Sequence, residues 1–397
     1  MLRRVAVPLF APALALLLAA TVGPADAEPR RRGPATVTIE TTGWGHGKGL
    51  SQYGARNRAA AGQSWQTIVR TYYPHTTLGS AGGRIRIRIT ADTTRDVRVL
   101  PRTGLKLHSL GARKTWRLPA KFRGKRITAW RIVPAGHRSR VQHKAGRWRD
   151  WRNPRGDAEF TAGSAPTTLV TPAGRAAYRG ALRSVSLSSS GAQRTTVNVV
   201  PLDTYLRGVV PREVLASWPA AAVRAQAVAA RTYADFERRD HRGSAYDLCD
   251  TSSCQVYGGY RAEHAASDAA VRATAGKVVM YGGRPAFAQF TSSNGGWSVD
   301  GGYPYLPAKA DPYDHGSAGD PTRKTFSARA ITRNWSDIGD LVSIEVTGRD
   351  GHGPYGGRVT EVTVTGTGTG AGNVTRKVSG AAFKSWMGLR ETLFRIT

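Results

Sequence analysis

The fold can be argued outward from one stretch, which reads LDTYLRGVVPREV at 202–214, SWP at 217–219 and AAAVRAQAVAARTYADFERR at 220–239. Pro219 suits the start of a helix, because proline has no amide hydrogen to donate there. In the Ala-rich run that follows, small residues recur on one face at Val223, Ala227, Ala230 and Ala234. The stretch therefore predicts a closely packed helix, preceded by a turn at 209–211.

Glu213 lies between this turn and the helix, among apolar residues. Loss of solvation raises the pKa of a carboxyl group, as a general acid for glycosidic cleavage requires. The same spacing also fits an exposed glutamate that is stabilised by the dipole at a helix N-terminus. Gln226, Arg231 and Tyr233 add polar groups to the expected helix, and they either orient a carboxylate or tie the helix to its surroundings.

Other catalytic classes lack their signatures in this sequence. There is no Gly-x-Ser-x-Gly elbow, no His-Glu-x-x-His and no cysteine placed as in papain-like enzymes. Acyl transfer and metal-dependent proteolysis are therefore excluded as leading hypotheses.

The segment at 43–55 reads GWGHGKGLSQYGA. Glycines at alternate positions exclude an ordinary helix or strand and predict a tight loop that a ligand or chain segment can approach closely. The spacing does not match a phosphate-binding loop. Helices are expected from Ser51 to about Ala60 and after Ser64, which is placed to cap the second.

Residues 84 to about 200 have a β-rich pattern, with perfect alternation of arginine and isoleucine over 84–89. Four tryptophans in this part either grip a polysaccharide or form the core of a small β domain: Trp116, Trp130, Trp148 and Trp151. Further on, 277–281 and 285–291 predict a hairpin. Ser292 and Ser293 open a polar loop that resembles a substrate-lining loop.

The chain has 397 residues and a formal charge of +31, with a sequence pI of about 11.1. Such a surface favours polyanions, including nucleic acid and anionic wall polymers, although a biased genome produces the same composition. Arg3 and Arg4, an apolar run to Val22 and Ala25-Asp26-Ala27 predict a secretory signal removed after residue 27. A membrane anchor is the competing reading. Export, and the lack of nucleic-acid motifs, argue against a nucleic-acid partner.

Cys249 and Cys254 are the only cysteines. In an oxidising compartment a short-loop disulfide is the simpler interpretation. A zinc site with His241, Cys249 and Cys254 is the alternative, although it falls short of a complete zinc signature.

Several of these segments together resemble the SpoIID/LytB family of sporulation stage II protein D and amidase-enhancer proteins. The resemblance rests on 203–213, 225–234, 255–259, 292–296, 379–390 and 43–55. In the sporulation proteins the Gly-x-Gly-His-Gly segment comes near the C-terminus, so this chain looks circularly permuted. Permutation is tolerated where termini lie close together, and we therefore expect the loop to fold back and bring His46 and Gln52 to a cleft.

The resemblance implies cleavage of peptidoglycan glycan strands, with Glu213 in the position of the catalytic glutamate. It implies that Gln226, Arg231, Tyr233, Ser292, Ser293 and His46 position the sugar or tune that acid. Some family members bind zinc near the cleft, although no cofactor is required. An amidase enhancer that binds peptidoglycan without cutting it, with a cell-wall amidase as partner, is the alternative.

The expected fold is α+β, mostly antiparallel β with a packed Ala-rich helix in a SpoIID-like core and an inserted β-rich domain. The expected organisation is a signal peptide at 1–27, a basic linker at 28–36, the glycine segment at 37–80, the β-rich domain at 84–195 and the core at 196–397. The product is expected to be secreted, associated with the cell wall, and without a transmembrane anchor after processing.

Overall fold

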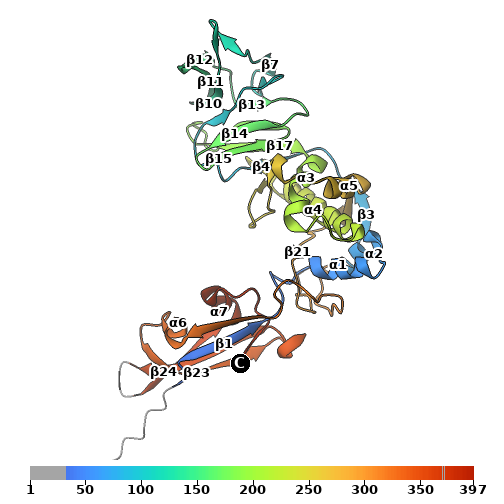
Figure 1. Cartoon of the computed structure of the whole chain (residues 1–397), viewed down its shortest axis with the longest axis vertical. Coiled ribbons are helices and arrows are strands. Elements are labelled where there is room, and N and C mark those ends of the chain that lie inside the picture. Colours follow the sequence, from blue (N-terminus) through green and yellow to red (C-terminus); the bar gives the residue numbers. More distant parts are fainter. Residues whose placement is uncertain (1–32, 369, 371) are drawn as a thin grey trace, which may run out of the picture.

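The computed structural model describes residues 33–368, 370 and 372–397, and its elements are strung along an elongated molecule (Figure 1). The expected signal peptide at 1–27 and most of the expected linker at 28–36 lie outside the described residues. Across the described ranges, seven α-helices and mainly antiparallel strands are compatible with an α+β fold. None of the helices described combines the length and apolar character that crossing a bilayer demands.

A β-rich unit occupies one end of the molecule and runs from β4 (Arg84–Arg88) to β17 (Arg194–Pro201) (Figure 1). Between them come β5 (Val97–Val99), β6 (Lys106–Ser109), β7 (Lys114–Arg117), β8 (Lys121–Phe122), β9 (Lys125–Arg126), β10 (Ala129–Ala135), β11 (Arg138–Ala145), β12 (Arg147–Arg152), β13 (Ala158–Thr161), β14 (Thr167–Thr171), β15 (Gly174–Tyr178) and β16 (Ala181–Ser186). Two large sheets result, in the orders β12-β11-β10-β5-β14-β15 and β18-β4-β17-β16-β13-β6-β7, of which β18 (Leu248–Cys249) comes from later in the chain.

The alternation in β4 explains why this unit folds. Its isoleucines Ile85 and Ile87 are fully buried in the core, as predicted, while the arginines of the opposite face stay outside it. Trp130 is buried in the same core, and Trp116 and Trp151 pack against it. These three tryptophans are therefore core residues.

The two ends of the β-rich unit lie side by side, because the last five residues of β17, 197–201, pair antiparallel with the whole of β4. A boundary between 195 and 196 is therefore wrong, since it falls inside β17. The strand continues to Pro201 because its last residues complete the ladder with β4, from Val197 opposite Arg88 to Pro201 opposite Arg84.

Helices form the middle of the molecule: α3 (Leu202–Glu213), α4 (Ala220–Asp240) and α5 (Ala265–Ala273), with α1 (Gln52–Ala60) and α2 (Trp65–Tyr72) on the other side of α4. The small-residue stripe of α4 is buried in the core shared with the β-rich unit, as predicted. A second face, with Ala225 and Val228, packs against α1 and α2. Ser64 caps α2 as expected, by accepting the amide hydrogen of Thr67, and Ser51 caps α1 by accepting that of Gly54.

One local prediction for this middle part is wrong, and another is right only in part. Residues 209–211 form the last turn of α3 rather than a separate turn, with Pro211 inside the helix. In the expected hairpin, only β20 (Arg284–Pro285) pairs with β19 (Lys277–Tyr281), whose other edge pairs with β3 (Thr77–Ser80). Phe290–Thr291, β21, pairs instead with β2 (Leu50–Ser51), in parallel.

The other end of the molecule is built from both ends of the described chain (Figure 1). There β1 (Thr36–Thr41) lies between β22 (Thr322–Ser327) and β26 (Phe394–Ile396). The same end holds α6 (Ala328–Thr332), β23 (Ile338–Arg349), β24 (Val359–Gly368), β25 (Asn373–Ser379) and α7 (Gly380–Met387). Residues 196–397 are thus not one core, because 322–397 form a hydrophobic core with β1 that is separate from that of α3 and α4.

Ile39, fully buried at the centre of β1, provides a test of this arrangement. Ile39→Ala removes apolar volume from a packed core, so we expect the free energy of unfolding of this end to fall by about 2–5 kcal/mol. Trp335 and Trp386 pack against the same core, and their fluorescence during urea unfolding reports the change. The exposed Thr36→Ala in the same strand should stay within about 0.5 kcal/mol of the parent. Equal effects of the two substitutions would contradict the central position of β1.

Candidate functional site

The glycine-rich loop lies against residues 289–295, far away in the sequence. Leu50 and Tyr53 donate backbone hydrogen bonds to the carbonyls of Gln289 and Ser292, at 3.1 and 3.0 Å. Gly45 and Gly49 both have positive φ, and a side chain at Gly49 would meet the Gln289 carbonyl oxygen at 2.0 Å. The glycines therefore permit close packing of two chain segments, one of the two possibilities predicted for the loop.

Glu213 is the last residue of α3, and its carboxylate is only partly exposed. The backbone amide of Val256 donates to its Oε1 at 3.2 Å, and the Gln52 side-chain amide donates to the same carboxylate. Burial raises the pKa of Glu213 above its ordinary value, although these two hydrogen bonds and the nearby Arg212 act in the opposite direction. The carboxyl thus has the environment of a general acid, and the N-terminal segment supplies part of it.

An aromatic contact secures the approach of α1 to this carboxyl. Tyr53, next to Gln52, packs edge-on against Trp218 with 5.1 Å between ring centroids. The Arg56 guanidinium lies over both rings, at 5.5 and 5.8 Å from their centroids. Because Trp218 belongs to the connection between α3 and α4, the contact joins α1 to the residues that follow Glu213.

Tyr205 and Gln255 are buried polar residues near Glu213. The Tyr205 hydroxyl donates to Oε1 of Gln255 at 3.1 Å, and Nε2 of Gln255 donates to the Ala230 carbonyl at 3.2 Å. The pKa of Tyr205 is raised well above its ordinary value by burial first, with the nearby Glu213 charge contributing. This hydroxyl therefore stays protonated and acts as a fixed hydrogen-bond donor.

Gln226 and Tyr233 lie on a face of α4 between its two packed faces. Gln226 is only 1% exposed, and within the described part of the chain neither atom of its amide has a hydrogen-bond partner. Tyr233 stacks on Phe287, with 5.5 Å between centroids, and its hydroxyl bonds the carboxylate of Glu237. Burial raises the pKa of both Tyr233 and Glu237. Glu237 was missed by the sequence analysis, although its position four residues after Tyr233 places it on the same helix face.

Arg231 does not contact the carboxyl of Glu213. Its fully buried guanidinium donates to Asp203 at 2.6 Å and to the carbonyls of Lys277 and Val271 at 3.1 and 3.3 Å. These bonds tie α4 to α3, α5 and β19, which is the structural alternative left open for this residue. Asp203 also accepts the amide hydrogen of Gly276, so it is committed to this linkage.

Ser292 and Ser293 lie in the loop that receives the glycine-rich segment. The Ser292 carbonyl accepts from Tyr53, whereas the Ser293 hydroxyl donates to Asp314 at 2.9 Å. Asp314 also accepts from Ser51 at 3.1 Å, and burial raises its pKa. Ser51 and Ser293 thus join the two segments through Asp314, a residue that the sequence analysis missed.

Asp311 is a second buried acid near Asp314 in the sequence, and the sequence analysis missed it as well. It accepts hydrogen bonds from Tyr72 at 2.6 Å, Arg58 at 2.9 Å and Asn294 at 3.1 Å. Two carboxylates three residues apart, at 311 and 314 of a strongly basic chain, were the available signal.

His46 lies at the surface of the loop rather than at the carboxyl. Its Nδ1 accepts the amide hydrogen of Lys48 at 3.0 Å, and its ring also bonds the Phe290 backbone. Desolvation of the ring, helped by Lys48 and Lys384, lowers the pKa of His46. Of the two loop residues expected at the site, Gln52 is therefore in contact with Glu213, and the contacts of His46 are with its own loop and β21.

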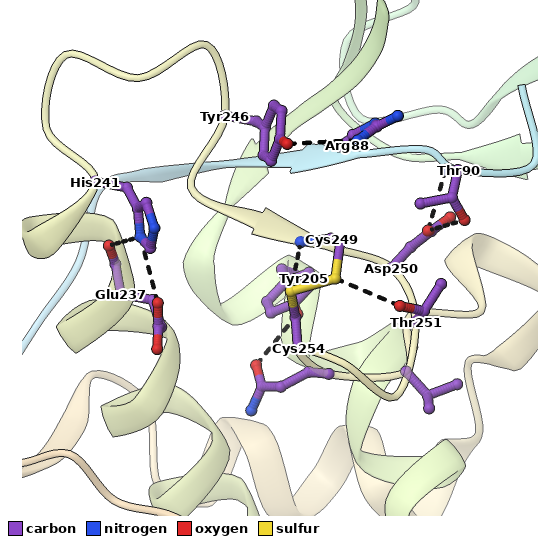
Figure 2. Close-up of a disulfide and its surroundings, with 12 residues drawn as sticks. Arg88, Thr90, Tyr205, Glu237, His241, Tyr246, Cys249, Asp250, Thr251 and Cys254 are labelled. Atoms are coloured by element: carbon purple, nitrogen blue, oxygen red, sulfur yellow. Dashed lines mark hydrogen bonds and ion pairs between the residues drawn. A yellow bond between two sulfur atoms is a disulfide. The ribbon is translucent and has the colours of Figure 1, made fainter. Parts of the chain in front are cut away.

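Cys249 and Cys254 form a disulfide, and Figure 2 shows the bridge beside Tyr205. The His241 ring bonds the backbone carbonyl of Glu237 at 3.0 Å and pairs with its carboxylate at 3.3 Å. The zinc site of His241, Cys249 and Cys254 is therefore wrong, because a disulfide leaves no thiolate to bind the metal. No group of three or more metal-ligating side chains occurs in the part of the chain that the structure describes.

The raised pKa of Glu213 makes a prediction about stability. A folded-state pKa above the unfolded one means that the folded protein favours the protonated carboxyl. Protonation of Glu213 therefore stabilises the fold fully below the unfolded pKa, and this contribution is lost as the pH rises through the folded pKa. Glu213→Gln keeps the shape without the charge. We expect a higher melting temperature than the parent at pH 8, with the gain vanishing near pH 4.

Glu361 is the matched control, because hydrogen bonds from Lys377 and Thr347 lower the pKa of this surface carboxyl. Glu361→Gln should therefore give no gain at pH 8. A pH-independent effect of Glu213→Gln would contradict the assignment of a desolvated carboxyl.

The central part of the chain is similar to proteins of a known family. Residues 190–281 match the family described as Stage II sporulation protein, SpoIID. The chain is 40% identical over 115 residues to the Amidase enhancer of Bacillus subtilis, a match that covers 28% of this chain and 15% of that protein. It is 29% identical over 196 residues to the Stage II sporulation protein D of Bacillus subtilis, covering 43% of this chain and 57% of that protein. The protein of that name from Bacillus amyloliquefaciens is 28% identical over 190 residues, with 42% and 51% covered.

These matches span less than two thirds of each relative. The family match at 190–281 covers α3, α4 and the loop that donates to Glu213, and it agrees with the resemblance of the motifs. The segment 190–281 is therefore a SpoIID-family domain, built around the helix pair that carries Glu213 and Gln226.

Proposed function

We propose that this protein is a secreted peptidoglycan lytic transglycosylase that cleaves the linkage between N-acetylmuramic acid and N-acetylglucosamine. The observation that carries the proposal is the Glu213 carboxyl, partly buried at the end of α3 and bonded by Val256 and Gln52. The family of 190–281 and the relatives named for sporulation and for amidase enhancement support a role at the cell wall.

One carboxyl is enough for this reaction. Protonated Glu213 gives its proton to the glycosidic oxygen as the bond from C1 of the muramic residue breaks. The C6 hydroxyl of the same residue then attacks C1, and the Glu213 carboxylate takes the proton of that hydroxyl. A 1,6-anhydro ring and a free N-acetylglucosamine end result, with no water consumed.

The alternative of two cooperating carboxylates needs a second acid within about 5–10 Å of the first. Asp203, the preceding acid in the sequence, lies ten residues earlier on α3, which is about 15 Å of helix, and is bonded to Arg231. The charged group that acts on the pKa of Glu213 is the cation Arg212. These observations favour the single-acid reaction over hydrolysis by an acid and base pair.

The Gln226 amide, the Tyr233 ring and the polar loop at Ser292 are proposed to position the glycan. A buried amide without a protein partner needs a hydrogen-bonding ligand or water. The basic surface is proposed to hold the protein on anionic wall polymers, in the compartment that the predicted signal peptide requires.

Digestion of purified glycan strands tests the reaction. The parent should release fragments with 1,6-anhydro-muramic ends, and Glu213→Gln should reduce their rate of formation at least 100-fold, because the proton donor is lost. Glu345→Gln, an exposed glutamate of β23, is the control and should keep the parental rate. Ordinary reducing ends would indicate hydrolysis, and equal activity of Glu213→Gln would exclude the proposed acid.

Gln52 offers a test of the tuning of this acid. Its hydrogen bond favours the charged carboxylate, so Gln52→Ala should raise the pKa of Glu213. Activity needs the protonated acid and is lost as the pH rises through its pKa. The alkaline limb of the profile of kcat/KM against pH should therefore move to higher pH in Gln52→Ala. A lower activity with an unmoved limb would assign Gln52 a structural role alone.

A second candidate function is an amidase enhancer that binds glycan without cutting it, favoured by the 40% identity to the protein of that name. In that case parent and Glu213→Gln are both inert on strands. Both would then bind sacculi and stimulate a cell-wall amidase equally.

A further inference from the structure

A hollow of about 550 Å³ lies where the β-rich unit meets the C-terminal end of α4. Arginines from three elements and the turn after α4 dominate its lining. The lining residues are Arg84, Arg86, Arg183, Val199, Arg238, Arg239, Arg242, Gly243 and Asp247. The alternation of β4 explains part of this, since it buries isoleucine on one face and presents arginine on the other.

The hollow has an excess of positive charge. Its six guanidinium groups face three carboxylates: Asp247 pairs with Arg86, Asp235 with Arg238 and Arg239, and Glu159 with Arg183. Arg84 donates to the Val199 carbonyl at 2.6 Å, and no described carboxylate forms an ion pair with it. Arg242 is exposed and has no ion-pair partner among the residues that the structure describes.

This hollow is separate from the Glu213 site. Gln52, which bonds Glu213, begins α1, and Ala55 of that helix shares a core with Ala225 and Ala229 in the N-terminal half of α4. The arginines of α4 lie at 238 and 239, about 15–20 Å further along the helix axis. The hollow is therefore not part of the surroundings of the Glu213 carboxyl.

We propose that the hollow binds a phosphodiester chain of the polyol-phosphate type found in anionic cell-wall polymers. Guanidinium groups match phosphate oxygens in geometry and charge, and they keep their charge at any physiological pH. No aromatic side chain lines the hollow, so a nucleobase or a sugar ring has no platform on which to stack. A flexible chain of phosphates without rings is the polyanion that this lining fits.

Binding of a poly(glycerol phosphate) oligomer to the full chain, measured by calorimetry at low salt, tests the proposal. Arg242→Glu reverses an exposed charge that makes no described ion pair, so it should fold normally and weaken binding at least tenfold. Arg333→Glu, an exposed position just after α6 at the other end of the molecule, is the control with the same change of net charge and should alter affinity less than twofold. Arg84→Gln should weaken binding as well.

Equal losses in Arg242→Glu and Arg333→Glu would overturn the site in favour of non-specific charge attraction. Single-stranded DNA or polyglutamate of equal charge that binds as tightly, with the same loss in Arg242→Glu, would overturn the choice of ligand. Glu213→Gln should bind the oligomer like the parent, so the result does not depend on glycan cleavage.

Discussion

The docking of the glycine-rich loop onto residues 289–295 is the constraint on which the candidate site depends. It joins β2 to β21 in parallel and starts α1 at Gln52, whose side-chain amide donates to the Glu213 carboxylate. Without it, the carboxyl would keep only the Val256 amide and would lie more open to water. The buried acids Asp311 and Asp314 hold this junction by accepting hydrogen bonds from both segments. Segments more than two hundred residues apart in sequence thus produce one chemical environment.

Glutamates in this protein differ because of their neighbours. Glu40 accepts hydrogen bonds from Arg323 and Tyr355, and these partners lower its pKa to about 2. Glu213 has one backbone amide and one neutral side chain as partners, so the cost of burial exceeds the stabilisation of its charge and the pKa rises. Only the second environment favours the protonated carboxyl that can donate a proton. The two carboxyls differ in their cationic partners. An arginine donates a hydrogen bond to Glu40, whereas the hydrogen-bond donors of Glu213 are neutral.

Arginine has two separate roles in the molecule. Arg231 is fully buried, and all three of its guanidinium nitrogens donate hydrogen bonds that tie α4 to α3, α5 and β19. The arginines of β4 and of the end of α4 instead gather around an open hollow. The family match at 190–281 covers the locked helices but little of the β-rich unit that supplies the other wall. The inserted unit therefore adds a charged surface to the family domain.

Patterns within short windows were enough to predict α1, α2 with its cap at Ser64, the buried stripe of α4 and the core face of β4. Such features depend on the nearest neighbours along the chain, and so does a disulfide between cysteines five residues apart. The division of 196–397, the pairing of β17 with β4, the pairing of β21 with β2, the hydrogen bonds of Asp311 and those of Arg231 could not be predicted in this way. Each depends on which distant segment lies opposite, and the hydrogen-bond partners that decide it come together only when the chain has folded.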